Sequence, residues 1–315
     1  MSRWDITDLD RIHSAELRVP GQEQRKESGN TKPSMGRSGS NSETTETEIE
    51  RPLQSTDRRT QGTDLRRRSY EVQGQSYSLR TTELQAMSDI GRFRAVDVQD
   101  LARFVYAHNE SRMSYDLENL RRQGLVEKKT MFRAHKPARK MVTLTAQGQQ
   151  LVRTASGLPE GQRFYHGIVK PRELHHDADL YKVYQKAARD IERRGGKNLR
   201  VRLDFELKES INRTKEAAGH LPEDMRERYL AAVAEEHGLT VDGTAIRLPD
   251  LQVEYTLADG RIERENLELL SQNYREQGIR SKTAAGFKIY ARAGETNRLR
   301  RALRDTGLVA EVLSV

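Results

Sequence analysis

The spacing of apolar residues predicts three successive helices in the first folded part of the chain. From Leu84 onward, and again from Val98 onward, apolar residues recur every three or four positions, which places them on one face of a helix. A third helical stretch covers residues 110–123 and is followed by Gly124, a residue type that commonly ends helices. The pattern therefore predicts a helical unit in which order begins near residue 77.

The period of the pattern changes after the third helix. Short strands are predicted over 125–129 and 140–144, and they are joined by a basic connection over 131–139 that contains a proline. Thr145 is a suitable N-cap for a last helix over 146–154. Three helices, a strand, a basic hairpin, a strand and a helix follow one another in the order of a winged helix.

Two phrases of this segment carry a further resemblance. GLVEKK at 124–129 and MVTLTAQGQQLV at 141–152 resemble the C-terminal half of bacterial winged-helix proteins, where the second wing strand leads into the final helix. We therefore assign residues 77–156 to a winged helix-turn-helix domain. In such a domain the third helix enters the major groove of double-stranded DNA, and the hairpin lies along the sugar–phosphate backbone.

The segments on either side of this domain have a different composition. Residues 1–76 are expected to form a disordered arm, because Gln22 to Asp64 is dominated by Ser, Thr, Gly, Arg and Glu and has few aliphatic side chains to bury. Gly, Pro and polar residues predict a linker over 157–172. Residues 173–315 then form the last predicted domain.

The pattern of residues 173–315 predicts a small α/β domain, so that the whole chain is of a mixed α+β class. Alternation of apolar and polar residues marks its strands, and a period of three to four marks its helices. The expected elements are a helix over 177–194, a strand over 199–207, a helical stretch from Pro222 to Gly238, strands over 246–256 and 262–270 with a turn at 258–260, a helix over 271–285, a strand over 287–291 and a basic helix over 295–304.

Charge favours a nucleic acid as the partner. The chain has 55 Lys and Arg against 47 Asp and Glu, a formal net charge of +8. Ser, Arg, Asn and Tyr on the outer face of the third helix can contact base edges or phosphates, and the basic hairpin can neutralise phosphates. The alternative is a solvated helix face or a helix-turn-helix that contacts protein. The candidate DNA-binding residues are Ser111, Arg112, Ser114, Tyr115, Asn119 and Arg122 of the helix and Lys128, Lys129, Arg133, His135, Lys136, Arg139 and Lys140 of the hairpin.

Several functional classes are excluded by composition. The chain has no cysteine, which excludes disulfides, Cys-ligated zinc and a Cys nucleophile. No apolar run approaches the roughly 18–20 residues of a membrane span, and the N-terminus lacks the apolar core of a secretion signal. We expect a cytoplasmic protein without a membrane partner that requires no cofactor to bind DNA.

Two acid-bearing phrases resemble the PD-(D/E)xK nuclease core. RLPDLQVEY contains Asp250 and ENLELL contains Glu268, and in that core an Asp and a Glu hold Mg²⁺ while a Lys two residues after the Glu assists catalysis. This chain has Leu270 at the position of that Lys, so an active Mg²⁺-dependent nuclease is the less favoured interpretation. The alternative is that the acids are ordinary surface residues. The candidate catalytic residues are Glu206, Asp250, Glu268 and Lys282, and the candidate metal ligands are Asp250 and Glu268.

Taken together, the two halves resemble the replication-relaxation proteins of bacterial plasmids and integrative elements over about residues 78–292. The resemblance rests on the winged helix and on ELHHDADLYKVY, RLDFELK, RLPDLQVEY and NLELL. It implies an accessory or regulatory DNA-binding factor in replication or transfer, with replication or transfer proteins and a second copy of the chain as candidate partners. The positions that match the family are His175 or His176, Glu206, Asp250 and Glu268.

Two questions stay open from the sequence alone. Adjacent residues on a helix point about 100° apart, so His175 and His176 are unsuited to share one metal ion, and a packing or capping role is favoured. The chain is interpreted as an accessory factor, with a nuclease and a winged-helix transcriptional repressor as the alternatives.

Overall fold

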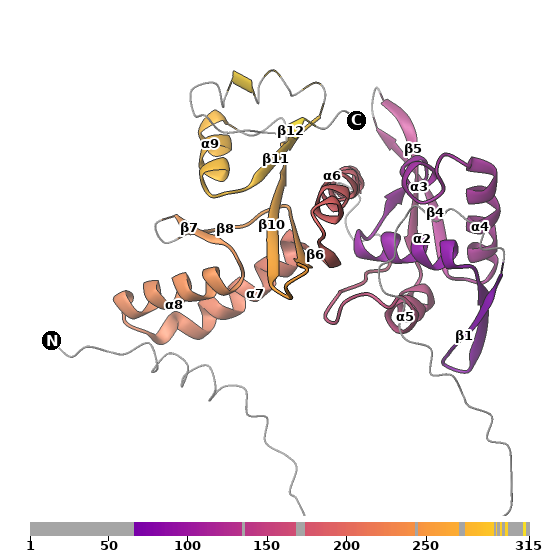
Figure 1. The fold of residues 1–315 in the computed structure, drawn as a ribbon, viewed down its shortest axis with the longest axis horizontal. Coiled ribbons are helices and arrows are strands. Elements are labelled where there is room, and N and C mark those ends of the chain that lie inside the picture. The colour runs from indigo at the N-terminus through magenta and orange to yellow at the C-terminus, as the bar shows by residue number, and fades with distance from the viewer. Residues whose placement is uncertain are drawn as a thin grey trace, which may run out of the picture. The chain divides into compact units, whose positions relative to one another are not determined.

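The computed structural model describes most of the chain from residue 66 onward (Figure 1). Residues 1–65, which make up most of the predicted disordered arm, lie outside the described residues. Most of the predicted basic helix over 295–304 lies outside them as well. The described residues are 66–133, 136–167, 174–242, 245–270 and 275–292, with short pieces at 294, 297, 300–301 and 311–312.

The last part of the predicted arm is ordered, which corrects its boundary at residue 76. Strands β1 (Arg68–Val72) and β2 (Gln75–Leu79) pair as an antiparallel hairpin. Gln73 and Gly74 both have positive φ in the turn between the strands, as two-residue hairpin turns require. Burial of the Leu79 and Tyr77 side chains in the core explains why this hairpin forms in a polar segment.

The following elements form the predicted winged helix. A three-stranded antiparallel sheet of order β3-β5-β4 packs with the helices, and Leu84, Met87, Ile90 and Leu117 lie in their common core. The helices expected over 110–123 and 146–154 are confirmed to within a residue or two. The elements are α2 (Thr81–Arg92), β3 (Val96–Asp97), α3 (Val98–Phe104), α4 (Glu110–Arg122), β4 (Val126–Arg133), β5 (Lys136–Leu144) and α5 (Ala146–Ala155).

The wing is longer and more regular than its sequence indicates. Residues 131–139 were expected to form the basic connection between two short strands, but β4 and β5 stay paired as far as Arg133 and Lys136. The expectation was wrong because the adjacent apolar residues Met131 and Phe132 and the proline at position 137 break the period-two alternation that marks a strand. The backbone hydrogen bonds of the hairpin continue regardless of that pattern.

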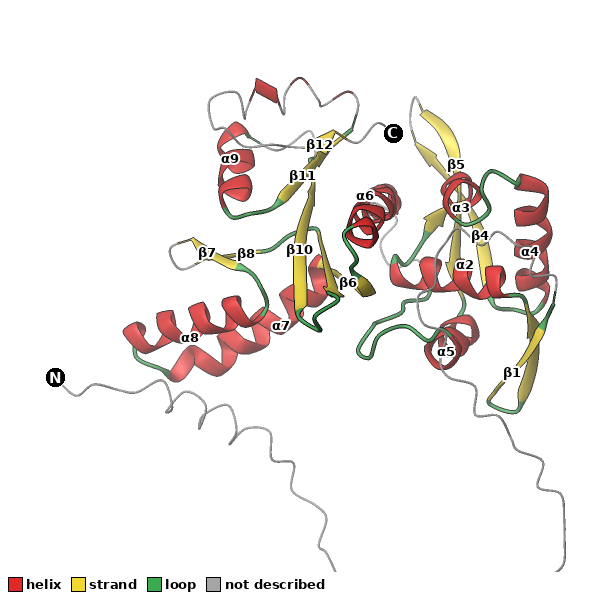
Figure 2. Ribbon diagram, in the orientation of Figure 1, coloured by secondary structure: helices red, strands yellow, loops and turns green. Residues whose placement is uncertain are grey.

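The second sheet has five strands in the order β12-β11-β10-β9-β6 (Figure 2). Strand β9 is antiparallel to both of its neighbours, β6 and β10, whereas β10, β11 and β12 run parallel to one another. Helix α6 packs against this sheet, and α7 packs against α8. The elements are α6 (Leu174–Arg193), β6 (Lys197–Leu203), α7 (Asp204–Ala217), η1 (Ala218–His220), α8 (Glu223–Glu236), β7 (Thr240–Asp242), β8 (Ala245–Arg247), β9 (Leu251–Thr256), β10 (Ile262–Leu269), α9 (Glu276–Ala284), β11 (Lys288–Ala291) and β12 (Glu311–Val312).

Two predicted strands of this part were wrong at their boundaries. The strand expected over 199–207 ends at Leu203, because the Glu206 carboxylate accepts the Leu203 amide at 3.1 Å and starts α7 instead. The strand expected over 246–256 is interrupted between β8 and β9, where Pro249 supplies no amide for a ladder. In both cases local chemistry of the backbone overrides an alternating pattern.

The segment predicted as a linker is irregular but packed, as far as it is described. The Phe164 side chain is buried in the core, and the Tyr165 amide donates to the Gly91 carbonyl at 2.7 Å. The Gln162 side chain accepts from the Val201 amide at 2.8 Å and donates to the Val201 carbonyl at 3.1 Å. Residues 157–167 therefore contact both α2 and the β6 strand.

A buried polar joint connects α2 to α6. The Asp89 carboxylate accepts from the Tyr181 hydroxyl at 2.8 Å and from the Gln185 amide at 3.1 Å, and it pairs with Arg92. Arg92 in turn donates to the Tyr184 hydroxyl at 2.8 Å. The residues predicted as two domains thus share one core, and those described after residue 66 belong to one compact unit.

Candidate nucleic-acid interface and carboxylate cluster

Helix α4 is held by one face and leaves the other exposed. The Asn109 side chain caps its first turn by accepting the Arg112 amide at 3.0 Å. Met113, Leu117 and Leu120 recur at helical spacing and are buried in the core. The opposite half of the helix is therefore fixed in place and open to solvent.

Four of the predicted DNA contacts on α4 lie on this open half. Ser111, Ser114 and Arg122 are exposed, and Tyr115 is 54% exposed. The guanidinium of Arg80 lies 5.2 Å from the centroid of the Tyr115 ring, which orients that ring beside the helix. These side chains can hydrogen-bond or stack with a ligand that lies along α4.

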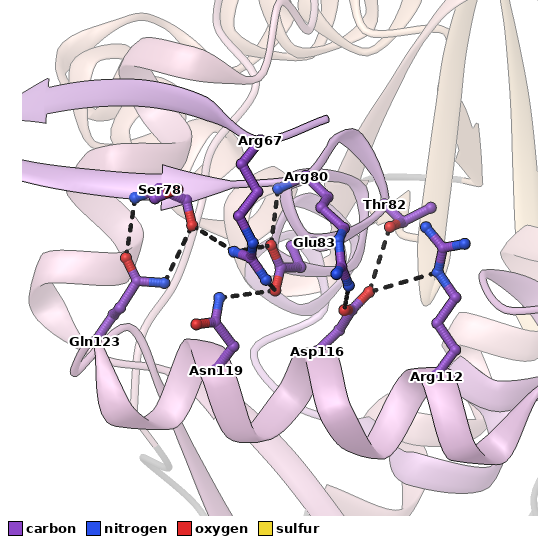
Figure 3. Close-up of polar contacts among 9 residues, drawn as sticks. All are labelled: Arg67, Ser78, Arg80, Thr82, Glu83, Arg112, Asp116, Asn119 and Gln123. Carbon is purple, nitrogen blue, oxygen red and sulfur yellow. Dashed lines mark hydrogen bonds and ion pairs between the residues drawn. The ribbon is translucent and has the colours of Figure 1, made fainter. Parts of the chain in front are cut away.

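Two further predicted contacts face the protein instead (Figure 3). The Asn119 amide donates to a Glu83 carboxylate oxygen at 2.8 Å, and Glu83 is fully buried. The Arg112 Nε atom lies 3.9 Å from the Asp116 carboxylate, which is also fully buried. Asn119 and Arg112 thus belong to the face of α4 that packs toward α2.

The polar network around Glu83 and Asp116 attaches the β1–β2 hairpin and α2 to α4. Glu83 accepts from the Arg80 amide at 2.7 Å and from the Arg67 guanidinium at 3.1 Å. Asp116 accepts from the Arg80 guanidinium at 2.5 Å. Two buried carboxylates are therefore matched by arginines, and no local sequence pattern indicates these pairs. The pairing depends on the hairpin, which was not predicted.

The hairpin supplies a basic surface beside α4. Lys128, Lys129 and Lys140 are exposed, and they line a cavity of about 350 Å³ together with Ser114 and Thr130. None of the ion pairs within the described part of the chain involves Lys128 or Lys140. The serine of the helix and the lysines of the hairpin thus face one concave surface.

The other predicted basic residues of the hairpin divide into two groups. Arg133 and Lys136 pair at the end of the hairpin, but their side chains, and all of His135, lie outside the described residues. Arg139 pairs with Met131 toward the turn end of the hairpin. Its guanidinium is 2.6 Å from Asp97, 3.7 Å from Asp100 and 3.5 Å from Asp179. Its charge is matched inside the protein.

A second cluster lies where β9 and β10 meet α6 and α9. The Asp250 amide donates to the Glu268 carboxylate at 3.1 Å, and the Leu269 amide donates to the Asp250 carboxylate at 2.9 Å. Lys282 forms an ion pair with Glu268 and donates to a backbone carbonyl at 3.2 Å. The structure thus brings together three of the four predicted catalytic residues.

His176 joins this cluster, although the sequence favoured a packing role for it. Its Nε2 atom lies 3.5 Å from an Asp250 carboxylate oxygen. Burial opposes protonation of the ring, yet the hydrogen bond with Asp250 and its charge leave the pKa of His176 above the usual value. The sequence signal for this position was the expectation, from the resemblance of ELHHDADLYKVY, that His175 or His176 has a functional role.

Glu206, the fourth predicted catalytic residue, has other contacts. It caps Leu203 in the first turn of α7 and lies 4.0 Å from Arg163. Burial raises the pKa of its carboxyl above the usual value. Within the described residues, no group of three or more His, Asp or Glu side chains is arranged to hold a metal ion.

The helix order and the β3-β5-β4 sheet define the first half of the described chain as a winged helix. No protein-family model matches the chain, and no curated protein matches it. The structure of Bacillus subtilis PadR in complex with operator DNA is similar to the chain at 15% sequence identity, with a TM-score of 0.21, over 50% of this chain and 92% of that chain. None of the described helices has the length and apolar composition that a membrane span requires.

Proposed function

We propose that this chain binds double-stranded DNA through α4 and the β4–β5 hairpin. The observation that carries the proposal is the concave surface on which exposed Ser114 of α4 meets Lys128, Lys129 and Lys140 of the hairpin. The major groove admits an α-helix, and hydroxyl groups on that helix can contact base edges. Lysines beside it neutralise phosphates and release counterions, which supplies affinity.

The proposed role is that of an accessory or regulatory factor in the replication or transfer of a mobile element. The sequence resemblance to replication-relaxation proteins favours this role, and a transcriptional repressor is the alternative. Footprinting on plasmid DNA separates the two roles. Protection at an origin or transfer site supports the accessory role, whereas protection of the promoter of the chain's own gene supports repression.

Binding itself is tested by a salt titration of the full chain with a fluorescently labelled mixed-sequence duplex. Lys128→Ala and Lys140→Ala are each expected to weaken binding and to lower the slope of log K against log salt by about one. Lys208→Ala removes an exposed lysine from α7 and serves as the matched control. Absence of binding at low salt, or equal losses in all three variants, contradicts the proposal.

The carboxylate cluster supports a second proposal, a Mg²⁺-dependent nuclease. Asp250 and Glu268 offer the hard oxygen ligands that Mg²⁺ prefers, and their carboxylates are held together by backbone amides. Lys282 reaches the cluster from α9 and pairs with Glu268, so a lysine is present although Leu270 replaces it in the sequence motif. A bound metal would supply an activated water for phosphodiester hydrolysis.

The nuclease is tested by incubating supercoiled plasmid with the full chain and Mg²⁺ or Mn²⁺. Asp250→Ala and Lys282→Ala are expected to abolish nicking and to preserve duplex binding. Glu263→Ala, which removes a 45% exposed acid from the same strand as Glu268, is expected to nick like the wild type. Intact plasmid with both metals contradicts the nuclease and leaves the DNA-binding proposal unaffected.

A further inference from the structure

The hairpin carries an apolar side chain that the rest of the described protein does not cover. Phe132 lies next to the end of β4 and is 82% exposed, more than the other large apolar side chains that are exposed in the described residues, Tyr115 at 54% and Ile262 at 59%. Transfer of a phenylalanine side chain out of water is favourable, and the cost of leaving it exposed scales with its apolar surface. An exposed ring on a hairpin of otherwise polar character therefore indicates a surface that is covered in a complex.

The local pairing also sets this position apart. Met131 pairs with Arg139 and Arg133 pairs with Lys136, so two residues of β5 lie opposite the single residue Phe132. Such a bulge bends the hairpin and redirects a side chain, and bulges are over-represented next to functional sites. Phe132 thus lies at an irregular point of the ladder, beyond the lysines of the same strand.

The charge around Phe132 decides which partner fits. Lys128 and Lys129 precede it on β4, and Lys140 lies on the paired strand. Lysine is depleted in protein–protein interfaces, whereas interfaces with DNA are strongly basic. An aromatic ring beyond a row of lysines therefore fits a nucleic acid better than an apolar protein surface.

We propose that Phe132 is a wedge that stacks on the bases of the bound duplex from the minor groove while the hairpin lysines hold the phosphates. This inference rests on the proposed DNA binding and adds a mode of recognition to it. Apolar side chains that enter the minor groove separate neighbouring base pairs and kink the duplex. Flexible pyrimidine–purine steps are then the preferred sites, because they unstack at the lowest cost.

A site-specific fluorophore tests the contact. The chain has a single tryptophan, Trp4, so Phe132→Trp combined with Trp4→Phe reports from the wing alone. Emission is expected to be quenched on binding a mixed-sequence duplex and to stay unchanged on binding heparin, a polyanion without bases. Ile262→Trp combined with Trp4→Phe, with Phe132 kept, places the single tryptophan at an exposed position of β10. Its emission is expected to change with neither ligand.

Affinity gives the second measurement. Phe132→Ala is expected to weaken duplex binding roughly tenfold, the scale of one lost base–aromatic stack, with heparin binding unchanged. Saturating duplex without quenching at position 132, or equal quenching by duplex and heparin, overturns the wedge while the binding curve still supports DNA binding. Absence of duplex binding by the wild type overturns both proposals.

Discussion

Asn119 and Ser114 show that residues of one helix have separate roles. Asn119→Ala removes a hydrogen bond from the buried Glu83 carboxylate, and it is expected to lower the free energy of unfolding by about 1–3 kcal/mol. Its duplex affinity should stay close to that of the wild type. Ser114→Ala lies on the exposed surface and is expected to weaken duplex binding while the unfolding free energy is unchanged. Urea denaturation and a duplex titration of both variants measure the two effects.

An Asn119→Ala protein with native stability and weakened DNA binding would contradict this division. The sequence predicted the helix but placed Asn119 on its outer face. Period alone identifies the apolar stripe of α4, made by Met113, Leu117 and Leu120. A polar residue beside that stripe is buried or exposed according to what packs there, and the β1–β2 hairpin that attaches to this region was not predicted.

The β4–β5 hairpin carries two neighbouring cations with opposite expected effects. Arg139→Ala leaves the mostly buried Asp97 and Asp100 without this partner, and it is expected to lower the free energy of unfolding by about 3–5 kcal/mol. Lys140→Ala is expected to leave stability unchanged and to reduce duplex affinity. Thermal unfolding followed by circular dichroism, together with the salt titration, measures both. Equal stability of the two variants would contradict the structural role of Arg139.

At the scale of elements, the sequence predicted the winged-helix order but not the β1–β2 hairpin or α7, and it misplaced the ends of several strands. The winged-helix order and the turn at Gly260 follow from periods and turn residues, which are local signals. The start of α7 at Asp204 depends on a single capping contact of Glu206, although Phe205 and Leu207 continue the alternation of β6. The same residues can therefore continue a strand or begin a helix, and the hydrogen bond of the Leu203 amide to Glu206 selects the helix.

The carboxylate cluster illustrates the same point for a site. Asp250 and Glu268 were recognised from adjoining strands, since paired strands bring such residues together. Lys282 and His176 reach these acids from helices α9 and α6. Lys282 lies 14 positions from its partner Glu268 in the sequence, and His176 is further still from Asp250. Glu206 resembled them in the sequence, but the turn into α7 gives it other partners. Residue type identified the candidate catalytic residues in the sequence, and the tertiary structure determines which of them lie in the carboxylate cluster.

At the scale of the whole molecule, the joint of α2 and α6 is expected to make unfolding cooperative. Asp89→Ala leaves the buried Arg92 without its carboxylate and is expected to lower the free energy of unfolding by about 3–5 kcal/mol. Asp190→Ala breaks a more exposed ion pair with Arg193, both on α6, and is expected to lower the free energy of unfolding by less than about 1 kcal/mol. Calorimetry measures both, and a small effect of Asp89→Ala would contradict the importance of the joint.

The carboxyl of Asp100, which lies 3.7 Å from Arg139 of the wing, makes the stability of the fold depend on pH. Burial, only partly offset by Lys182 and Arg139, raises the pKa of Asp100 to about 6. The unfolded value is about 3.9, so the folded protein holds this proton longer, and the stability that Asp100 contributes is full below about pH 4 and lost as the pH rises through about 6. Asp100→Asn does not titrate. The unfolding free energy of the wild type, relative to that of this variant, is therefore expected to fall by roughly 2 kcal/mol between about pH 4 and pH 7. Urea titrations across this range measure the difference, and a constant or rising difference would show that Asp100 ionises normally in the fold.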